Sequence, residues 1–243
     1  MNSNKCYNIF LNILSAIPLI SFFALYNKLP DKIASSFDFS GNITEYSSKG
    51  TIAMLFVLPI IILIVLQIAP KIDPKANNYS KFSKIYNNIK LLIVIILNIT
   101  FLSIIINALY PNIVLIHKVI ILTIGVSFVF LGKWMPQIQP NFIIGIRTPW
   151  TLSSEEVWTK THKIGGICFI IGGTCFIIGA ICLIIGGMYF IIGGTTSIFV
   201  VFFSRNVLPA MLLIAAGIAG LIPIIMSYMY YKNLHIDKEK SGN

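Results

Sequence analysis

Long uninterrupted runs of apolar residues alternate along the chain with short polar segments. A helix needs about 20 consecutive, mostly apolar residues to cross roughly 30 Å of hydrocarbon, and five stretches between successive lysines or arginines are long enough. A sixth, between Lys118 and Lys133, is shorter, so its span must include His117 and Lys118 at one end and Trp134 at the other. We therefore predict about six transmembrane helices. Their expected cores are residues 8–27, 51–69, 89–109, 113–135, 164–186 and 207–231.

The composition agrees with this pattern. The 243 residues are 56% hydrophobic and only 11% charged, whereas an ordinary soluble domain is roughly 25% charged. The first apolar run lacks a small-residue cleavage site and continues as a span, so no cleavable signal peptide is expected. The predicted fold class is an all-α, polytopic membrane protein.

Lysine and arginine residues are distributed unevenly between alternate loops. A net charge of +10 could indicate nucleic acid as a partner of a soluble protein, but in a membrane protein cytoplasmic loops carry the excess of Lys and Arg. With six spans, thirteen of the 18 Lys and Arg fall on one side, opposite residues 28–50. We predict that both termini are cytoplasmic, and that the direct partner is the lipid bilayer rather than nucleic acid. The thirteen are Lys5, Lys71, Lys75, Lys81, Lys84, Lys90, Lys133, Arg147, Lys160, Lys163, Lys232, Lys238 and Lys240.

These spans and charges divide the chain into three consecutive regions. An N-terminal two-span region is followed by a basic cytoplasmic linker and then by a four-span region that contains a polar cytoplasmic segment, called the lid below, and a glycine repeat. In that order the regions are 1–69 with the outer loop 28–50, 70–90, and 91–243 with the lid 136–163 and the repeat 165–194.

Residues 165–194 repeat with a period of seven, reading GGICFII GGTCFII GAICLII GGMYFII GG. Glycines recur at 165, 172, 179, 186 and 193, so one narrow helical stripe carries small residues that let membrane helices approach closely. The uncharged stretch 164–204 is about twice the length that one span needs. Either one helix runs on past the outer surface, or a hairpin turning near 193–197 adds a span. The charge asymmetry favours six spans.

The cysteines do not indicate a disulfide framework or a metal site. Cys168, Cys175 and Cys182 are seven residues apart in one predicted helix, about 10 Å by helical rise, which is beyond disulfide reach. No histidine or carboxylate accompanies them in that run. We predict no metal and no cofactor.

The linker carries aromatic residues at helical spacing. Tyr79, Phe82, Tyr86 and Ile89 share one face, with lysines left free for water or anionic headgroups. This pattern is typical of an amphipathic segment leading into the third span. A docking surface for a partner is the alternative.

Prolines interrupt the lid. Pro136 and Pro140 exclude regular helix, and Pro149 restricts Thr148, so Arg147 is expected on a rigid, extended turn. Ser153 and Glu156 form an S-x-x-E capping box that would start a helix.

Two interpretations of the lid remain open. In the first, Trp150 and Trp158 are aromatic anchors at the headgroup layer, and an ion pair from Arg147 to Glu155 or Glu156 fixes the loop. In the second, the segment is a binding site for a ligand, lipid or partner, since rigid loops presenting charge and Trp are typical recognition surfaces.

The same residues resemble a known family. The sequence GIRTPWTLSSEEVWTKTH (145–162), preceded by Gly132, Met135, Pro136 and QPN (139–141), closely resembles the C-terminal signature of the SdpI family of bacterial membrane proteins. Two further sets of residues resemble the cytoplasmic linker of that family and the short domain of unknown function that precedes it. They are Asp73, Pro74, Asn78, Tyr79, Phe82 and Tyr86, and Leu29, Pro30, Ile33, Phe37 and Gly41.

The resemblance implies a six-span protein of the bacterial cell membrane that protects its cell against a secreted toxic peptide. It also implies sensing of that peptide and recruitment of a small cytoplasmic autorepressor. The candidate binding residues are Asn141, Arg147, Thr148, Pro149, Trp150, Ser153, Glu155, Glu156, Trp158, His162, His117 and Lys118.

Two other classes of function were weighed against immunity. A transporter is the alternative, because His117 and Lys118 are ionisable residues of a span and Asn98, Ser103 and Asn107 could line a polar path. Snorkelling to the interface and interhelical hydrogen bonding also explain these residues. An enzyme is not expected, because the chain has three histidines, no HExxH motif and no nucleophile elbow.

Overall fold

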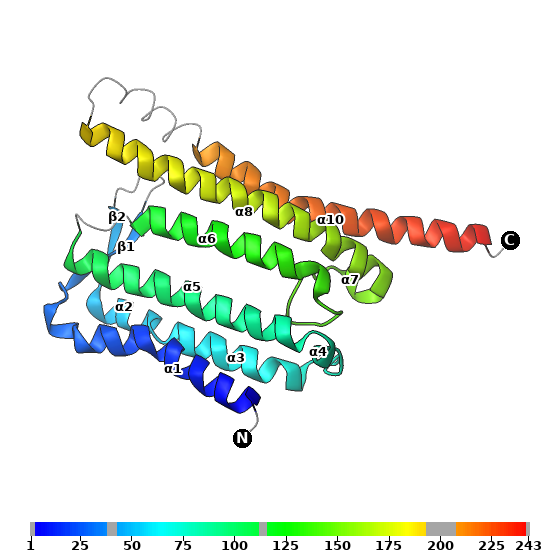
Figure 1. The fold of residues 1–243 in the computed structure, drawn as a ribbon, viewed down its shortest axis with the longest axis horizontal. Coiled ribbons are helices and arrows are strands. Elements are labelled where there is room, and N and C mark those ends of the chain that lie inside the picture. Colours follow the sequence, from blue (N-terminus) through cyan, green and yellow to red (C-terminus); the bar gives the residue numbers. More distant parts are fainter. Residues whose placement is uncertain (1–2, 38–42, 112–115, 193–207, 242–243) are drawn as a thin grey trace. The chain divides into compact units, whose positions relative to one another are not determined.

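The computed structural model describes residues 3–37, 43–111, 116–192 and 208–241 (Figure 1). These residues are mostly helical, as predicted. The helices are α1 (Ser3–Ala24), α2 (Lys49–Leu55), α3 (Leu58–Ile72), α4 (Asn78–Lys81), α5 (Ser83–Leu109), α6 (Ile116–Trp134), α7 (Pro149–Ser153), α8 (Glu155–Ile192) and α10 (Leu208–Ser241), with 3-10 turns η1 (Tyr26–Lys28) and η2 (Met135–Gln137).

Within the described residues, six stretches are long and apolar enough to cross a membrane, which agrees with the predicted number of spans. Large apolar side chains such as Ile20 and Leu213 lie exposed on these helices, as expected for contact with lipid. The placement of both termini in the cytoplasm stays a prediction. The six stretches are Lys5–Ala24, Lys49–Ile72, Ser83–Leu109, Lys118–Gln137, Glu155–Cys182 and Pro209–Leu234.

The second and fifth spans differ in continuity. Between α2 and α3 the helix is interrupted, because Pro59 has no N–H to donate to the carbonyl of Leu55. By contrast, α8 is one helix from Glu155 to Ile192 (Figure 1). It therefore extends beyond the length of one span, which favours the single-helix account up to Ile192. The hairpin turn expected near 193–197 lies outside the described residues.

The outer loop contains strands that the sequence analysis did not predict. β1 (Lys32–Phe37) pairs antiparallel with β2 (Ile43–Ser48). The side chain of Lys49 ties the base of this hairpin to the preceding turn, since its Nζ donates to the carbonyl oxygens of Tyr26 and Leu29, both at 3.1 Å. The overall class remains all-α.

The chain forms two compact units, each assembled from separate segments. Unit 1 comprises Met1–Ile68, Lys90–Ile124 and Ile177–Ala210, and unit 2 comprises Ala69–Ile89, Gly125–Phe176 and Met211–Asn243. The predicted division into three consecutive regions stays a prediction.

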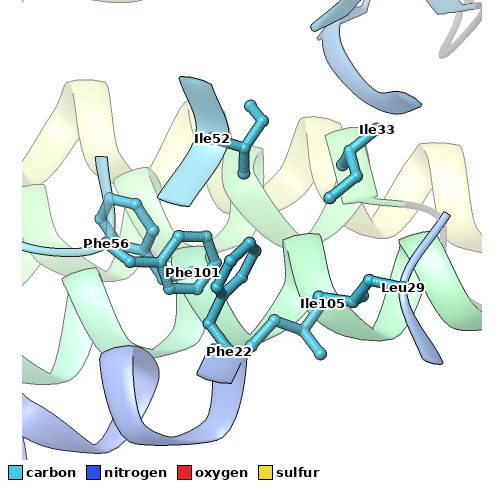
Figure 2. Packing of buried hydrophobic residues seen from close by; sticks show 7 residues of the cluster. All are labelled: Phe22, Leu29, Ile33, Ile52, Phe56, Phe101 and Ile105. Carbon is cyan, nitrogen blue, oxygen red and sulfur yellow. The ribbon is translucent and has the colours of Figure 1, made fainter. Parts of the chain in front are cut away.

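Aromatic rings form the centre of unit 1 (Figure 2). The ring of Phe56 packs against Phe22 and Phe101, with centroid distances of 4.5 Å and 4.8 Å. Ile33, from strand β1, is buried in the same cluster. The hairpin is therefore attached to the spans through an apolar contact as well as through Lys49.

Glycines set the helix spacing in unit 2. A methyl group on Gly132 of α6 would lie 2.5 Å from the carbonyl oxygen of Gly166 in α8, and one on Gly173 would lie 2.6 Å from the carbonyl oxygen of Gly125. On the neighbouring face of α8, a methyl group on Gly172 would lie 3.0 Å from the carbonyl oxygen of Ala215 in α10. The sequence predicted one close-packed stripe, whereas the neighbouring glycines Gly172 and Gly173 face two different helices, α10 and α6.

Replacing Gly132 with alanine should destabilise unit 2, because the added methyl group would force α6 away from the backbone of α8. Overpacking of this kind costs typically about 1–3 kcal/mol. The measurement is the midpoint of unfolding in mixed detergent micelles, followed by tryptophan fluorescence. Gly217→Ala in α10 is the control, because nothing lies within 4 Å of its added methyl group. An equal loss in both variants would contradict the proposed spacing role.

Candidate functional site

The linker and the lid are about 60 residues apart in sequence, yet both belong to unit 2. The aromatic face of the linker is buried, as the spacing predicted. Tyr79, Phe82 and Tyr86 are all less than 7% exposed. The segment is not one helix, however, because α4 ends at Lys81, the following Phe82 has a non-helical φ of −129°, and α5 begins at Ser83. These aromatic residues pack inside the protein and do not form a membrane-facing surface.

A buried carboxylate joins the two segments. Asp73 is 4% exposed. Its Oδ2 accepts hydrogen bonds from the Tyr79 hydroxyl at 2.7 Å and from the Phe142 amide at 2.8 Å, and its Oδ1 accepts one from the Lys75 amide at 2.7 Å. A buried charge is tolerated where it is hydrogen bonded in this way. The sequence analysis missed Asp73 as a site residue, although it is the only acidic residue of the linker.

A second contact runs in parallel with the first. The side-chain amide of Asn78 donates to the carbonyl oxygen of Pro140 at 2.8 Å. The Nζ of Lys75 lies 5.9 Å from the centroid of the Phe142 ring, near the outer limit for a cation–π contact. The start of the lid is therefore held to the linker at two positions, Pro140 and Phe142.

Hydrogen bonding outweighs burial at Asp73. Burial alone raises the pKa of this carboxyl, but the bonds from Tyr79, Lys75 and Phe142 and the charge of Lys75 together hold the pKa below its usual value. For Tyr79, burial and then the hydrogen bond to Asp73 raise the pKa well above the ordinary value of 10. The pair is therefore an ionised carboxylate accepting from a neutral phenol.

Asn141 organises the lid from inside. It is completely buried, and its Nδ2 donates to the carbonyl oxygens of Gln139 and Ile144 at 2.8 and 3.0 Å. Its Oδ1 accepts from the amides of Ile143 and Ile144 at 2.9 and 2.7 Å. All four hydrogen-bonding positions of the side chain are used. Together with Asp73, Asn141 satisfies three consecutive backbone amides of the loop.

Arg147 does not make the predicted ion pair. Its Nη1 donates to the carbonyl oxygen of Phe142, while Glu156 pairs with Lys160 at 2.7 Å, one helical turn further along α8. The Arg147 hydrogen bond closes a six-residue loop, 142–147, within the lid. In the described part of the chain, the expected pairing with Glu155 or Glu156 is wrong, because the guanidinium donates to a backbone carbonyl of its own loop instead.

His162 and Trp158 form the interior of the lid. The ring of His162 stacks on Trp158 with a centroid distance of 4.0 Å. Its Nε2 accepts from the Ile146 amide at 3.1 Å, and its Nδ1 bonds to the Trp158 carbonyl at 2.9 Å. Only a neutral ring protonated on Nδ1 satisfies both contacts. Gly145 has a φ of 118° and faces the His162 ring closely, so a side chain is excluded there.

The two tryptophans of the lid play different roles. Trp158 is 1% exposed and its Nε1 donates to the carbonyl oxygen of Ile138 at 2.8 Å, so its prediction as a headgroup anchor is wrong. Trp150 is only partly buried and lies edge-on to Tyr228 of α10 at 5.2 Å.

Pro149 begins a helix rather than only interrupting one. Thr148 has the predicted extended backbone (φ −100°, ψ 161°), and it caps α7 reciprocally with Thr151. Its Oγ1 also lies 3.1 Å from the hydroxyl of Ser227 in α10. The predicted capping box at Ser153 is wrong, since the Ser153 hydroxyl donates to the Trp150 carbonyl and Ser154 caps the start of α8.

The remaining candidates lie outside this site. Lys118 belongs to unit 1, is 8% exposed and sits in α6, while the side chain of His117 is outside the described residues. Asn98 and Ser103 donate to carbonyl oxygens one turn earlier in their own helix. Among the residues that the structure describes, no group of three or more His, Cys, Asp or Glu could hold a metal ion.

The site is therefore a rigid loop between membrane-spanning helices. Its buried polar groups hold the loop together, and its charged side chains lie at the surface. Arg147, Glu155 and Glu156 are exposed, whereas Asn141, Thr148, Trp158 and His162 are buried. Such an arrangement suits recognition at the membrane surface. The fold and the site define a multi-pass membrane protein with a braced loop connecting two of its spans.

Comparison with known proteins shows what the chain is similar to. Residues 137–227 match the SdpI/YfhL protein family, and residues 13–63 match a domain of unknown function, DUF1648. The chain is 24% identical over 229 residues to a protein of Bacillus subtilis (strain 168) named "Immunity protein SdpI", covering 94% of this chain and 97% of that one. No solved structure matches significantly. These matches confirm the resemblance to the SdpI family that the sequence motifs indicated.

Replacing Asp73 with asparagine should loosen the lid from the linker. An amide offers one acceptor oxygen and places N–H donors against at least one of the three donors that Asp73 accepts from. Each buried donor left unsatisfied costs about 1–3 kcal/mol. The measurement is hydrogen exchange at the amides of residues 142–144. Tyr79→Phe, which removes one donor and leaves the carboxylate, should show a smaller effect, and equal effects would contradict the central role of Asp73.

The lowered pKa of Asp73 also predicts a pH dependence. A carboxyl whose folded pKa lies below its unfolded value of 3.8 stabilises the folded state fully above that value. The stabilisation is lost as pH falls from there through the lower folded pKa. Comparing unfolding midpoints of the wild type and Asp73→Asn between pH 6 and pH 2 isolates this contribution. The difference between the two proteins should shrink toward acid pH, and a constant difference would contradict the assignment.

Proposed function

We propose that this protein protects the bacterium that makes it against a secreted antimicrobial peptide, acting as an immunity protein in the cell membrane. The similarity along nearly the whole length to the B. subtilis immunity protein carries the proposal. Six apolar spans support a site of action in the bilayer. The identity between the two chains is low, but the alignment covers nearly all of both. The similarity therefore extends over the whole architecture and is not confined to one motif.

Protection requires contact with the peptide or with the lipid around it. The β1–β2 hairpin is the candidate contact on the outer side, because it is a shaped, partly exposed structure attached to the spans through Ile33 and Lys49. The lid is the candidate responder on the other side. A coupling between them needs two states with different affinities for the peptide, and this coupling is part of the proposal.

We further infer that sensing, as the family resemblance implies, uses the first turn of α8. Glu155 and Glu156 are exposed there, beside the rigid cap formed by α7. A small basic repressor docking on these carboxylates is the proposed cytoplasmic partner. Trp158, which the sequence placed among the docking residues, supports this surface from inside.

A transporter is the second candidate function, because Lys118 is a buried lysine within a candidate span and intramembrane ionisable residues commonly mark transport paths. Proteoliposomes loaded with a pH- or potential-sensitive dye test this reading. Flux that depends on Lys118 would favour transport over immunity.

The decisive experiment for immunity expresses the chain in bacteria that are sensitive to an Sdp-type peptide. Cells with the wild-type protein should keep their membrane potential and survive. Arg147→Ala should lower the tolerated peptide concentration about tenfold, which corresponds to about 1.4 kcal/mol, because the loop loses its closing hydrogen bond. Glu156→Ala tests the surface of α8 in the same assay.

The matched control is Lys81→Ala, an exposed cation of the linker outside these contacts. It should protect as well as the wild type at equal membrane abundance. Collapse of the potential in cells that contain well-folded wild-type protein would overturn the proposed function.

A further inference from the structure

Two cations flank one exposed aromatic ring on unit 2. Phe142 is 38% exposed. Arg147 is tied to its carbonyl oxygen, and the Nζ of Lys75 lies 5.9 Å from its ring centroid. These three residues, which come from both the linker and the lid, are called the cationic patch below.

The patch is held rigidly before anything binds. The Phe142 amide is fixed by Asp73, and the Lys75 amide is fixed by the same carboxylate. Arg147 follows Gly145 and Ile146, which are locked against His162, and precedes the extended Thr148. A guanidinium held by one nitrogen retains further N–H donors in a planar fork that matches phosphate oxygens.

The charges of the patch are available for an external anion. In the described residues, neither Arg147 nor Lys75 forms an ion pair with a carboxylate side chain. Asp73, whose charge acts on Lys75, is buried and already accepts three hydrogen bonds. Its acceptor capacity therefore faces inward, away from a ligand at the surface.

The patch lies a few residues beyond the ends of two candidate spans, which places it close to the membrane surface. Lys75 is three residues beyond the end of the span Lys49–Ile72, and Phe142 is five residues beyond the end of Lys118–Gln137. Three residues reach at most about 10 Å, while the headgroup layer is about 5–7 Å thick on each side of the hydrocarbon. The span that starts at Glu155 returns to the same level.

We propose that Arg147, Lys75 and Phe142 form a binding site for the phosphate headgroup of an anionic phospholipid. The Arg147 fork and the Lys75 ammonium bind the phosphate oxygens, and the exposed ring of Phe142 lies along the glycerol and upper acyl region. The bound lipid joins the linker to the lid from outside, in parallel with Asp73 inside. Charge complementarity and the short distance from the ends of the spans favour a lipid headgroup over an acidic protein.

The chain carries its own probe for a test. Its three tryptophans, Trp134, Trp150 and Trp158, all lie in unit 2, so intrinsic fluorescence reports from the unit that contains the patch. The purified full chain is placed in phosphatidylcholine vesicles that contain a small fraction of brominated phosphatidylglycerol or, in a parallel sample, brominated phosphatidylcholine. Stronger quenching by the anionic lipid measures its enrichment at the site.

Each basic residue near the membrane should contribute about a fivefold preference, the equivalent of about 1 kcal/mol. Lys75→Gln should therefore reduce the enrichment of phosphatidylglycerol about fivefold, and Arg147→Gln should reduce it at least as much. The Lys75 side chain makes no hydrogen bond that supports the loop, and its amide contact with Asp73 remains in the variant, so Lys75→Gln tests binding without unfolding the lid. Lys81→Gln is the matched control and should keep the wild-type preference.

Several results would overturn the proposal. Equal quenching by the two lipids would show that the patch does not select anionic headgroups, and an equal loss in Lys81→Gln would show a diffuse basic field rather than a site. If millimolar glycerol phosphate displaces the quenching lipid and the protein shows no preference between the two vesicle lipids, the patch is a site for a soluble phosphate. Displacement by a micromolar acidic peptide would identify a protein-docking surface. None of these readouts requires a toxic peptide, so they are independent of immunity.

Discussion

The carboxylate of Asp73 has to keep its charge where only 4% of the residue reaches solvent, and it can do so only by collecting donors from two segments about 70 residues apart. The Tyr79 hydroxyl and the Lys75 amide come from the linker, and the Phe142 amide comes from the lid. Because an unpaired buried charge is strongly unfavourable, the hydrogen bond from the lid stabilises the ionised form of Asp73. The same bond fixes the Phe142 amide, next to Asn141 and at the start of the loop that Arg147 closes.

Close helix packing supplies the second constraint. The lid leaves α6 just after Gly132 and returns to the membrane in α8 just before Gly166, and these two glycines bring the helix backbones together. The two ends of the loop therefore start from a fixed separation. Gly165 adds to this, since its face of α8 meets Met135, just before the lid, and Ile146, within it. A short, cross-linked loop on a narrow base has little freedom, which suits a recognition surface.

Local patterns in the sequence were sufficient for the spans and for the extended turn at Thr148, because hydrophobic length and proline geometry act over a few residues. Local patterns were insufficient to predict hydrogen-bond partners that are distant in the sequence or brought together by the fold of the loop. Arg147 was assigned to a nearby carboxylate, yet it bonds a backbone carbonyl that the fold of the loop brings into reach. Trp158 was assigned to the headgroups because tryptophans often lie there, but its Nε1 finds a carbonyl inside. The β1–β2 hairpin was not predicted, because the apolar pattern of the spans was the main signal in the first 70 residues.

The seven-residue period of α8 means that the helix consists of repeated units of similar length and orientation. Seven residues advance a helix by about 10 Å and return a side chain to within about 20° of its starting direction. Loss or gain of one repeat would therefore change the length of α8 by two turns while each glycine stripe continues to face its own neighbour. Related chains could match α8 to bilayers of different thickness in steps of one repeat, leaving the lid and its contacts with the linker undisturbed.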